Sequence, residues 1–232
     1  MKQIVLAWAV RVFTALGLVA AAAIAVLIVD GSDQSFYWAF WLMIAATAID
    51  ALDGPLARYA RVGEVLPGFD GRRLDDLIDF LNYTCLPLLL IWRAGVVADS
   101  QAWWLLVPLL ASIYGFSQVD AKTEDGFFLG FPSYWNVVAF YLYFLRLDSR
   151  LSVGIILLLA VLTFVPLRYF YPTQPGMWNR AICVLAALWG VSLIVILMFP
   201  DGTRMPWLKV SMVFPVGYLV LSWGLELRRK VR

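Results

Sequence analysis

Residues 48–58 read Ala-Ile-Asp50-Ala-Leu-Asp53-Gly54-Pro-Leu-Ala57-Arg58, and residues 71–79 read Gly71-Arg-Arg-Leu-Asp75-Asp76-Leu-Ile-Asp79. Both stretches adjoin long apolar runs. Residues three or four apart share one face of a helix, so Asp50 pairs with Asp53 and Asp75 pairs with Asp79. Ionised carboxylates in or beside a bilayer are costly unless something cationic neutralises them. These two stretches therefore bear on both the fold and the function of the protein.

The sequence around the acids is that of a membrane protein. Of its 232 residues, 62% are hydrophobic and 15% are charged, and a transmembrane helix needs about 20 apolar residues. We expect an all-α, polytopic bundle of about eight transmembrane helices, forming a single catalytic domain over residues 1–232. The expected spans are residues 12–29, 36–57, 74–92, 102–119, 133–147, 151–169, 181–199 and 206–225.

The distribution of basic residues predicts the topology. With both termini in the cytoplasm, the inner segments carry thirteen cations, Lys2, Arg11, Arg58, Arg61, Arg72, Arg73, Lys122, Arg168, Arg180, Arg228, Arg229, Lys230 and Arg232. The outer segments carry five, Arg93, Arg146, Arg150, Arg204 and Lys209. This bias follows the positive-inside rule and places the acidic stretches at the cytoplasmic face. Trp103, Trp104, Trp135, Trp178 and Trp207 fall near span ends, where interfacial anchors are expected.

The composition excludes several kinds of chemistry. The chain has no histidine, which removes Ser-His-Asp hydrolysis, phosphohistidine intermediates and imidazole metal sites. Cys85 and Cys183 lie in apolar runs without metal-ligand spacing, so we expect core residues rather than a disulfide or zinc site. A net charge of +2 gives no reason to expect nucleic acid as a partner.

Four clustered carboxylates without histidine or cysteine suit hard divalent ions such as Mg²⁺, Mn²⁺ or Ca²⁺. Two such ions would balance the four charges and would grip a diphosphate during phosphoryl transfer. Gly54, Ala57 and Gly71 fall one helical turn from acids, where small side chains allow a ligand or another backbone to come close. The alternative is that the acids are solvated and paired with nearby arginines. That interpretation would suffice for a single Asp, but it does not explain four Asp residues at helical spacing.

The pattern Asp50-x2-Asp53-Gly54-x2-Ala57-Arg58-x12-Gly71-x3-Asp75-x3-Asp79 resembles the signature of the CDP-alcohol phosphotransferase family. Most members have eight residues between the arginine and the second glycine. The twelve found here are similar to the subgroup of bacterial phosphatidylcholine synthases, which condense CDP-diacylglycerol with choline and release CMP. The eight expected helices also resemble that subgroup.

The resemblance implies roles for the motif residues. Asp50, Asp53, Asp75 and Asp79 would hold two Mn²⁺ or Mg²⁺ ions, and Asp79 would also be the general base. The nucleotide would lie against Asp53, Gly54, Ala57, Arg58 and Gly71. The implied setting is the bacterial inner membrane, with the site facing the cytoplasm, membrane lipids as neighbours and a homodimer as a candidate assembly.

Choline is a quaternary ammonium, which aromatic faces and a nearby negative charge bind well. The candidate contacts are Asp76, Asn82, Tyr83, Tyr114, Tyr134 and Trp135. The segment Phe127-Phe128-Leu129-Gly130-Phe131-Pro132-Ser133 is reminiscent of a Gly-x-Pro element in related phosphatidylserine synthases and reads equally well as a helix breaker.

Other functions stay open at this point. Serine, inositol or glycerol 3-phosphate could replace choline as the acceptor, although a phosphorylated acceptor calls for more basic residues near the site. A cation channel or transporter would spread its acids across the membrane depth and over several helices. A purely structural membrane protein leaves the acids unexplained.

Overall fold

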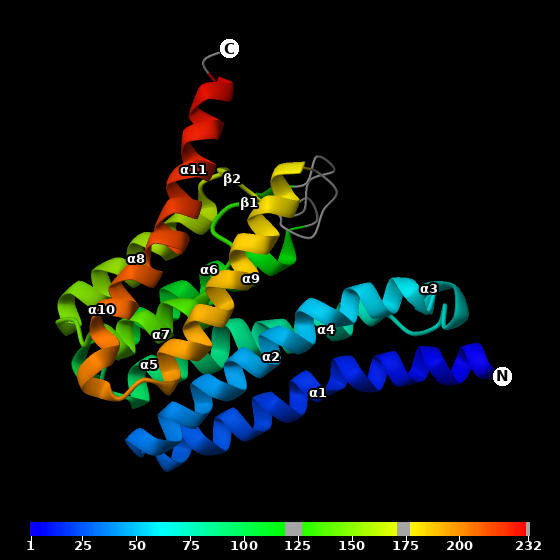
Figure 1. The fold of residues 1–232 in the computed structure, drawn as a ribbon, viewed down its shortest axis with the longest axis horizontal. Helices are drawn as coiled ribbons and strands as arrows, with labels where there is room; N and C mark the ends of the chain where they lie inside the picture. The colour runs from blue at the N-terminus through cyan, green and yellow to red at the C-terminus, as the bar shows by residue number, and fades with distance from the viewer. Residues whose placement is uncertain (119–126, 171–176, 231–232) are drawn as a thin grey trace. The chain divides into compact units, whose positions relative to one another are not determined.

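The computed structural model describes residues 1–118, 127–170 and 177–230, and most of these residues are helical. Among the positions discussed above, Lys122, Arg232 and residue 119 of the fourth span lie outside these ranges, as do the side chains of Phe127, Phe128, Trp178, Arg180, Arg228, Arg229 and Lys230. The described elements are α1 Lys2–Asp30, α2 Asp33–Tyr59, α3 Val62–Val65, α4 Gly71–Asp79, the π-helical turn η1 Phe80–Cys85, α5 Leu86–Arg93, the 3₁₀ helix η2 Asp99–Leu105, α6 Leu106–Ser117, β1 Phe127–Leu129, α7 Trp135–Leu145, α8 Ser149–Phe164, β2 Arg168–Phe170, α9 Met177–Met198, α10 Asp201–Ser211 and α11 Val213–Lys230 (Figure 1).

The described residues form two compact units. Unit 1 comprises Met1–Asp99 with Trp135–Phe140, and unit 2 comprises Ser100–Tyr134 with Tyr141–Arg232. Unit 1 contains both acidic stretches of the sequence. The expectation that residues 1–232 act as a single catalytic domain stays a prediction.

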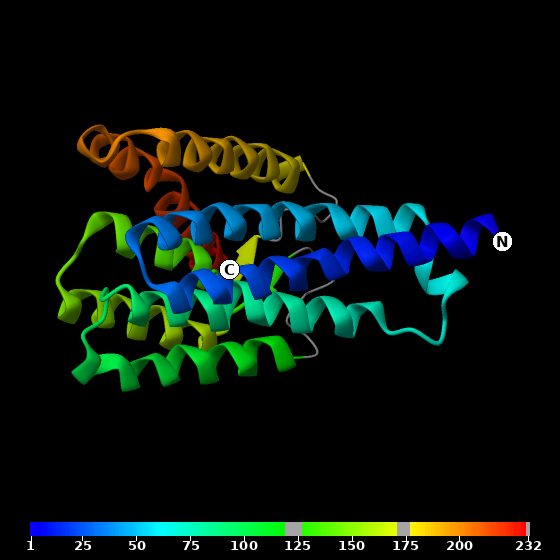
Figure 2. The same cartoon turned by 90° about the horizontal axis from the view of Figure 1, so that it is seen from below.

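Unit 1 is built on a regular seam between α1 and α2. The buried residues of α1 include Ala7, Val10, Thr14, Gly17, Ala21, Ile24 and Ile28, which are alternately three and four residues apart. That spacing keeps one face of a helix against its neighbour. In α2, Phe36, Ala39, Met43, Ala46 and Asp53 are buried at compatible spacings. Most of these side chains are small, so the two helices approach closely and run side by side (Figure 2).

The turn between α1 and α2 has clear local causes. Gly31 ends α1 with a φ of 73°, a left-handed conformation that glycine adopts without strain. Ser32 then caps α2, because its hydroxyl accepts a hydrogen bond from the Ser35 amide. This short connection makes the two helices antiparallel neighbours.

The third expected span is one helical run with an irregular middle. Residues 71–93 pass through α4, the π-helical turn η1 and α5, and the Leu86 amide donates to the Leu81 carbonyl five residues earlier. Pro87 follows immediately and has no amide hydrogen, so it cannot continue the α-helical ladder back to Tyr83. This run packs against α1 at Gly17, where an added Cβ would lie 2.7 Å from Ile78 Cγ2.

Unit 2 corrects one boundary of the sequence prediction. The sixth span was expected to stay helical to residue 169, but α8 ends at Phe164. Pro166 explains the early end, because proline disfavours a helical conformation in the residue before it. The chain then forms β2, whose Arg168, Tyr169 and Phe170 pair antiparallel with Leu129, Phe128 and Phe127 of β1.

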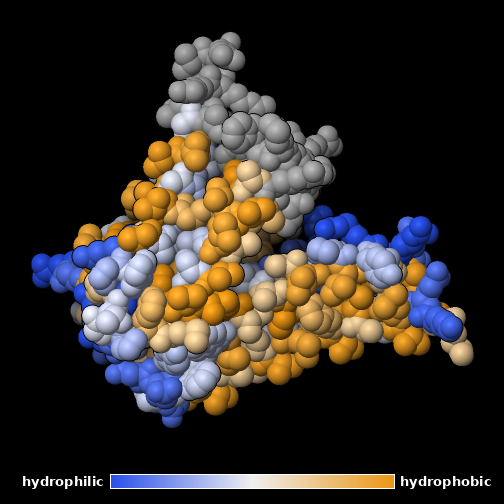
Figure 3. Space-filling model, in the orientation of Figure 1, coloured by the Kyte–Doolittle hydropathy of each residue, from blue (hydrophilic) through white to orange (hydrophobic). Residues whose placement is uncertain are grey.

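The helices support a membrane protein with several spans. Among the described residues, Lys2–Asp30, Asp33–Tyr59, Ala181–Met198 and Asp201–Gly224 are long and apolar enough to cross a membrane, and Trp135–Leu145 and Ser149–Phe164 are shorter apolar helices. Each of the eight expected runs contains helix, which confirms the all-α polytopic class. Apolar side chains cover the flank of α1 and α2, whereas hydrophilic ones gather at the end of unit 1 that holds the N-terminus and α3 (Figure 3).

Arg204 of α10 closes the end of α9 inside unit 2. Its side chain donates to the carbonyls of Ile196, Leu197 and Phe199 and to the Asp201 carboxylate, at 2.7–3.2 Å. Its guanidinium also lies 4.7 Å from the centre of the Phe144 ring. Carbonyls in the last turn of a helix have no partner within the helix, so Arg204 supplies one. From the sequence, Arg204 was expected only to be one of the five basic residues of the outer segments.

Replacing Arg204 by methionine should therefore destabilise unit 2. The substitution keeps an extended apolar side chain but leaves helix-end carbonyls without their donor, a loss of about 1–3 kcal/mol per buried group. The melting temperature of purified protein in detergent is the measurement. Lys209→Met, at an exposed site on the same helix, is the matched control. Equal melting temperatures for the two variants would contradict this role of Arg204.

Candidate active site

The acids of α2 continue the seam by which α2 packs. Ala46, Asp50 and Asp53 follow one another at spacings of four and three residues, so the acids occupy the face that apolar residues occupy earlier in the helix. Asp53 is only 6% exposed. Pro55, two residues further on, has no amide hydrogen to donate to the Ala51 carbonyl. The face of α2 that packs through apolar residues up to Ala46 thus carries the acids over its next two turns.

The second pair of acids lies on α4, which begins immediately before them. Asp70 caps this helix by accepting a hydrogen bond from the Arg73 amide at 3.0 Å. Asp75 and Asp79 follow one turn apart on the face toward α2. Helical spacing alone predicted this common face, and the cap fixes where the helix starts.

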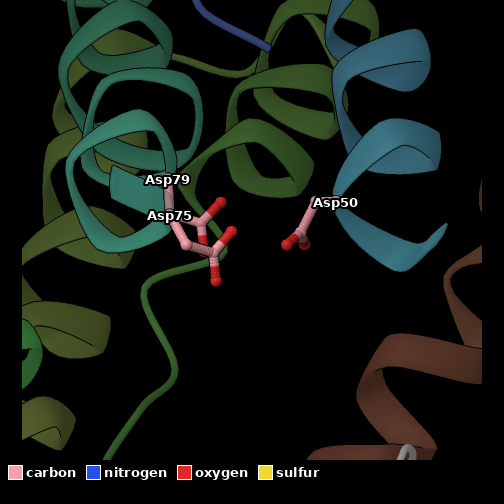
Figure 4. A group of neighbouring side chains, drawn as sticks. All are labelled: Asp50, Asp75 and Asp79. Atoms are coloured by element: carbon pink, nitrogen blue, oxygen red, sulfur yellow. The ribbon is translucent and has the colours of Figure 1, made fainter. Parts of the chain in front are cut away.

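The two helices bring three acids together. One carboxylate oxygen from each of Asp50, Asp75 and Asp79 lies within 4.8 Å of the others, and Figure 4 shows Asp50 facing the other two across the space between α2 and α4. Asp53 lines the same pocket without belonging to this close group. The structure therefore places all four acids at one pocket within unit 1.

The donor set suits a hard divalent cation. Mg²⁺ and Ca²⁺ bind carboxylate oxygens at about 2.0–2.6 Å, so oxygens that share one ion are separated by no more than roughly 5 Å. The observed spread of 4.8 Å falls within that limit. Three like charges so close repel one another strongly outside bulk water, and a bound cation would relieve that repulsion. The geometry thus supports a site for at least one divalent ion.

Two side chains of the π-helical turn, Asn82 and Tyr83, form hydrogen bonds at the pocket with α1 and α2. The Tyr83 hydroxyl donates to Asp50 Oδ2 at 2.7 Å. The Asn82 amide nitrogen donates to the carbonyls of Gly17, at 3.0 Å, and Ile78, at 3.1 Å. Both side chains line the pocket. The sequence flagged them as choline contacts and gave no sign of these hydrogen bonds, although Tyr83 lies one turn after Asp79.

The residues expected to contact the nucleotide have identifiable neighbours. An added Cβ at Gly54 would lie 3.4 Å from Arg58 Nη1, so the Arg58 side chain folds back along α2. Ala57 packs on a small cluster formed by Ala7, Val10, Ala60 and Val62. A Cβ at Gly71 would overlap the Arg11 guanidinium of α1. Close approach to α1 is thus one reason for small residues at 57 and 71, and their nucleotide contacts stay predictions.

The remaining choline candidates are dispersed. Asp76 is half-buried on α4 and does not line the acidic pocket, and Trp135 is completely buried in unit 1. Tyr114 and Tyr134 belong to unit 2, where the Tyr114 ring packs 4.9 Å from that of Phe164. Of the six candidates, Asn82 and Tyr83 are therefore the ones placed at the pocket.

The segment at residues 127–133 also belongs to unit 2. Gly130 has a φ of 80°, its amide donates to the Leu167 carbonyl, and the Phe131 amide donates to the Leu162 carbonyl. The segment thus forms β1 and a turn against the end of α8. This arrangement agrees with the helix-breaking interpretation of Gly130 and Pro132.

Comparison with known proteins gives a consistent result. The family model for CDP-alcohol phosphatidyltransferase matches residues 8–166, which include all four acids. The chain is 37% identical to the phosphatidylcholine synthase of Legionella pneumophila, over 96% of this chain and 89% of that protein. It is 34% identical to the phosphatidylcholine synthase of Legionella bozemanae, over 82% and 92%. It is 28% identical to that of Borreliella burgdorferi, over 95% and 94%.

The acidic cluster predicts an unusual response of stability to mutation. Asp75→Asn removes one of three repelling charges, so this variant should melt at a higher temperature than the wild type in EDTA. It should also lose most of the rise in melting temperature that Mn²⁺ gives the wild type, because ion binding stabilises only the folded site.

Glu64→Gln, at an exposed position in the short helix α3, is the charge-matched control and should change neither quantity. A lower melting temperature of Asp75→Asn in EDTA, together with an undiminished response to Mn²⁺, would contradict the ion site.

Proposed function

Because this chain belongs to the CDP-alcohol phosphatidyltransferase family, we propose that it is a phosphatidylcholine synthase. The reaction transfers the phosphatidyl group of CDP-diacylglycerol to choline and releases CMP. The observation that carries the proposal is the meeting of Asp50, Asp75 and Asp79 at one pocket, in a chain whose relatives named phosphatidylcholine synthase match it over most of its length.

The four acids are proposed to hold two divalent ions, Mn²⁺ or Mg²⁺, at the pocket. Such ions stabilise the negative charge of a diphosphate as one phosphorus-oxygen bond breaks and another forms. The acids would set the position of these ions, and through the ions that of the diphosphate, because Asp50 and Asp53 come from α2 while Asp75 and Asp79 come from α4. The β-phosphorus would then lie between two helices that both pack on α1.

Asp79 is proposed as the general base. An alcohol is a weak nucleophile, and a carboxylate within hydrogen-bonding distance accelerates its attack by taking the proton. The choline hydroxyl gives its proton to an Asp79 carboxylate oxygen, its oxygen bonds to the β-phosphorus, and the bond to CMP breaks. Asp79 is the acid nearest the π-helical turn, which places it beside the pocket residues Asn82 and Tyr83.

The nucleotide is proposed to lie near the cytoplasmic end of α2, along Asp53, Gly54 and Arg58. Arg58 folds toward Gly54, so a guanidinium is available on the same helix as two of the acids. Ala57 and Gly71 complete the proposed nucleotide contacts, and their small size also lets α1 come close.

The acceptor is proposed to be choline for two reasons. The relatives at 28–37% identity are named phosphatidylcholine synthase, and the residues that line the pocket include four acids and no lysine or arginine. The cytoplasmic termini and the cytoplasmic site are proposed from the positive-inside bias, and the bacterial inner membrane is proposed from the family resemblance. A homodimer stays a further prediction.

A direct assay tests the acceptor. Purified protein with CDP-diacylglycerol and Mn²⁺ is offered choline, serine, inositol and glycerol 3-phosphate in parallel, and CMP release is measured. We expect release with choline alone. EDTA should stop the reaction and added Mn²⁺ should restore it. Release with a different alcohol would replace choline as the acceptor, and activity in excess EDTA would remove the ion from the mechanism.

Asp79→Asn tests the base. The amide cannot accept the proton, so turnover should fall by at least about a hundredfold, while CDP-diacylglycerol should still raise the melting temperature. Asp99→Asn makes the same chemical change at an exposed residue outside the pocket and should keep wild-type turnover. An active Asp79→Asn enzyme would assign the base to another group.

A further inference from the structure

Tyr83 makes a hydrogen bond that the family motif does not explain. Its hydroxyl donates to Asp50 Oδ2 at 2.7 Å, and its side chain is 9% exposed. The bond joins the helical run that carries Asp75 and Asp79 to α2, which carries Asp50. It is thus a direct link between the two halves of the carboxylate cluster.

The π-helical turn sets up this link. Tyr83 follows Asp79 by four residues, so the two side chains lie one above the other on the same side of the run. Its neighbour Asn82 donates to the Gly17 carbonyl of α1. The turn therefore ties the third helical run to α1 through one residue and to α2 through the next.

We infer that Tyr83 is a positioning residue that orients the Asp50 carboxylate for ion binding, an inference that rests on the proposed ion site. A carboxylate can rotate about its Cβ–Cγ bond, and a hydrogen bond to one oxygen limits that rotation. Hydrogen bonds that fix the orientation of metal-binding side chains commonly raise metal affinity.

This role differs from a contact with choline. The Tyr83 hydroxyl hydrogen is donated to Asp50 Oδ2, whereas a quaternary ammonium binds to the face of an aromatic ring. If Tyr83 acts through Asp50, loss of its hydroxyl changes the affinity for the ion. If Tyr83 contacts the acceptor, the same change alters the affinity for choline. The two roles therefore separate in binding and kinetic measurements.

Tyr83→Phe is the decisive variant, because it keeps the ring and removes only the hydroxyl. Mn²⁺ binding is measured by electron paramagnetic resonance on purified, metal-free protein without substrates. We expect the Kd for Mn²⁺ to rise about tenfold. Tyr59→Phe, which removes the hydroxyl of an 82% exposed residue at the end of α2, should leave the Kd unchanged. An unchanged Kd in Tyr83→Phe overturns the inference.

Kinetics then separate positioning from misfolding and from acceptor binding. In Tyr83→Phe, the Mn²⁺ concentration for half-maximal activity should rise with the Kd, kcat should recover at saturating Mn²⁺, and the KM for choline should stay the same. Failure to recover at high Mn²⁺, or a raised KM for choline with normal Mn²⁺ binding, overturns the inference. Since the binding measurement uses no acceptor, it stands even where the choline assay fails.

Discussion

Packing between helices holds like charges together in this protein. The carboxylates of Asp50, Asp75 and Asp79 come within 4.8 Å of one another, an arrangement that electrostatics alone opposes. The opposing force is the burial of small apolar side chains along α1 and α2, together with the close approach of Ile78 to Gly17. The packing of α2 and α4 on α1 therefore sets the distances between the acids. A shift of α4 against α1 would move Asp75 and Asp79 relative to Asp50.

Among the described residues, Arg204 and the acids at the pocket are charged groups in very different surroundings. Arg204 is buried and bonded to three carbonyls and one carboxylate, so it stabilises the fold. The acids at the pocket instead gather like charges, and the repulsion between those charges opposes folding. A local arrangement that destabilises the folded state is a common sign of a functional site. The contrast explains why the acids, rather than the buried arginine, mark the site.

Much of the site was accessible from the sequence, because the helix has a fixed period. Spacings of three and four residues put Asp50 with Asp53 and Asp75 with Asp79 on common faces, and the absence of histidine pointed to carboxylate chemistry. Local rules explain the misses as well. Pro166 ends α8 before residue 169, and Pro87 follows the π-helical turn. Both prolines were visible, but a hydropathy window averages over them.

The sequence by itself determined a helical membrane protein of the CDP-alcohol phosphatidyltransferase family, with its acids in phase on two helices, because apolar composition and helical periodicity are local properties. Only the tertiary structure decided which acids meet closely, that Gly71 lies under Arg11, and that Tyr83 bonds Asp50. Those facts depend on how α1, α2 and α4 approach one another. That approach is set by side-chain packing between segments far apart in the chain, which no spacing within one segment records.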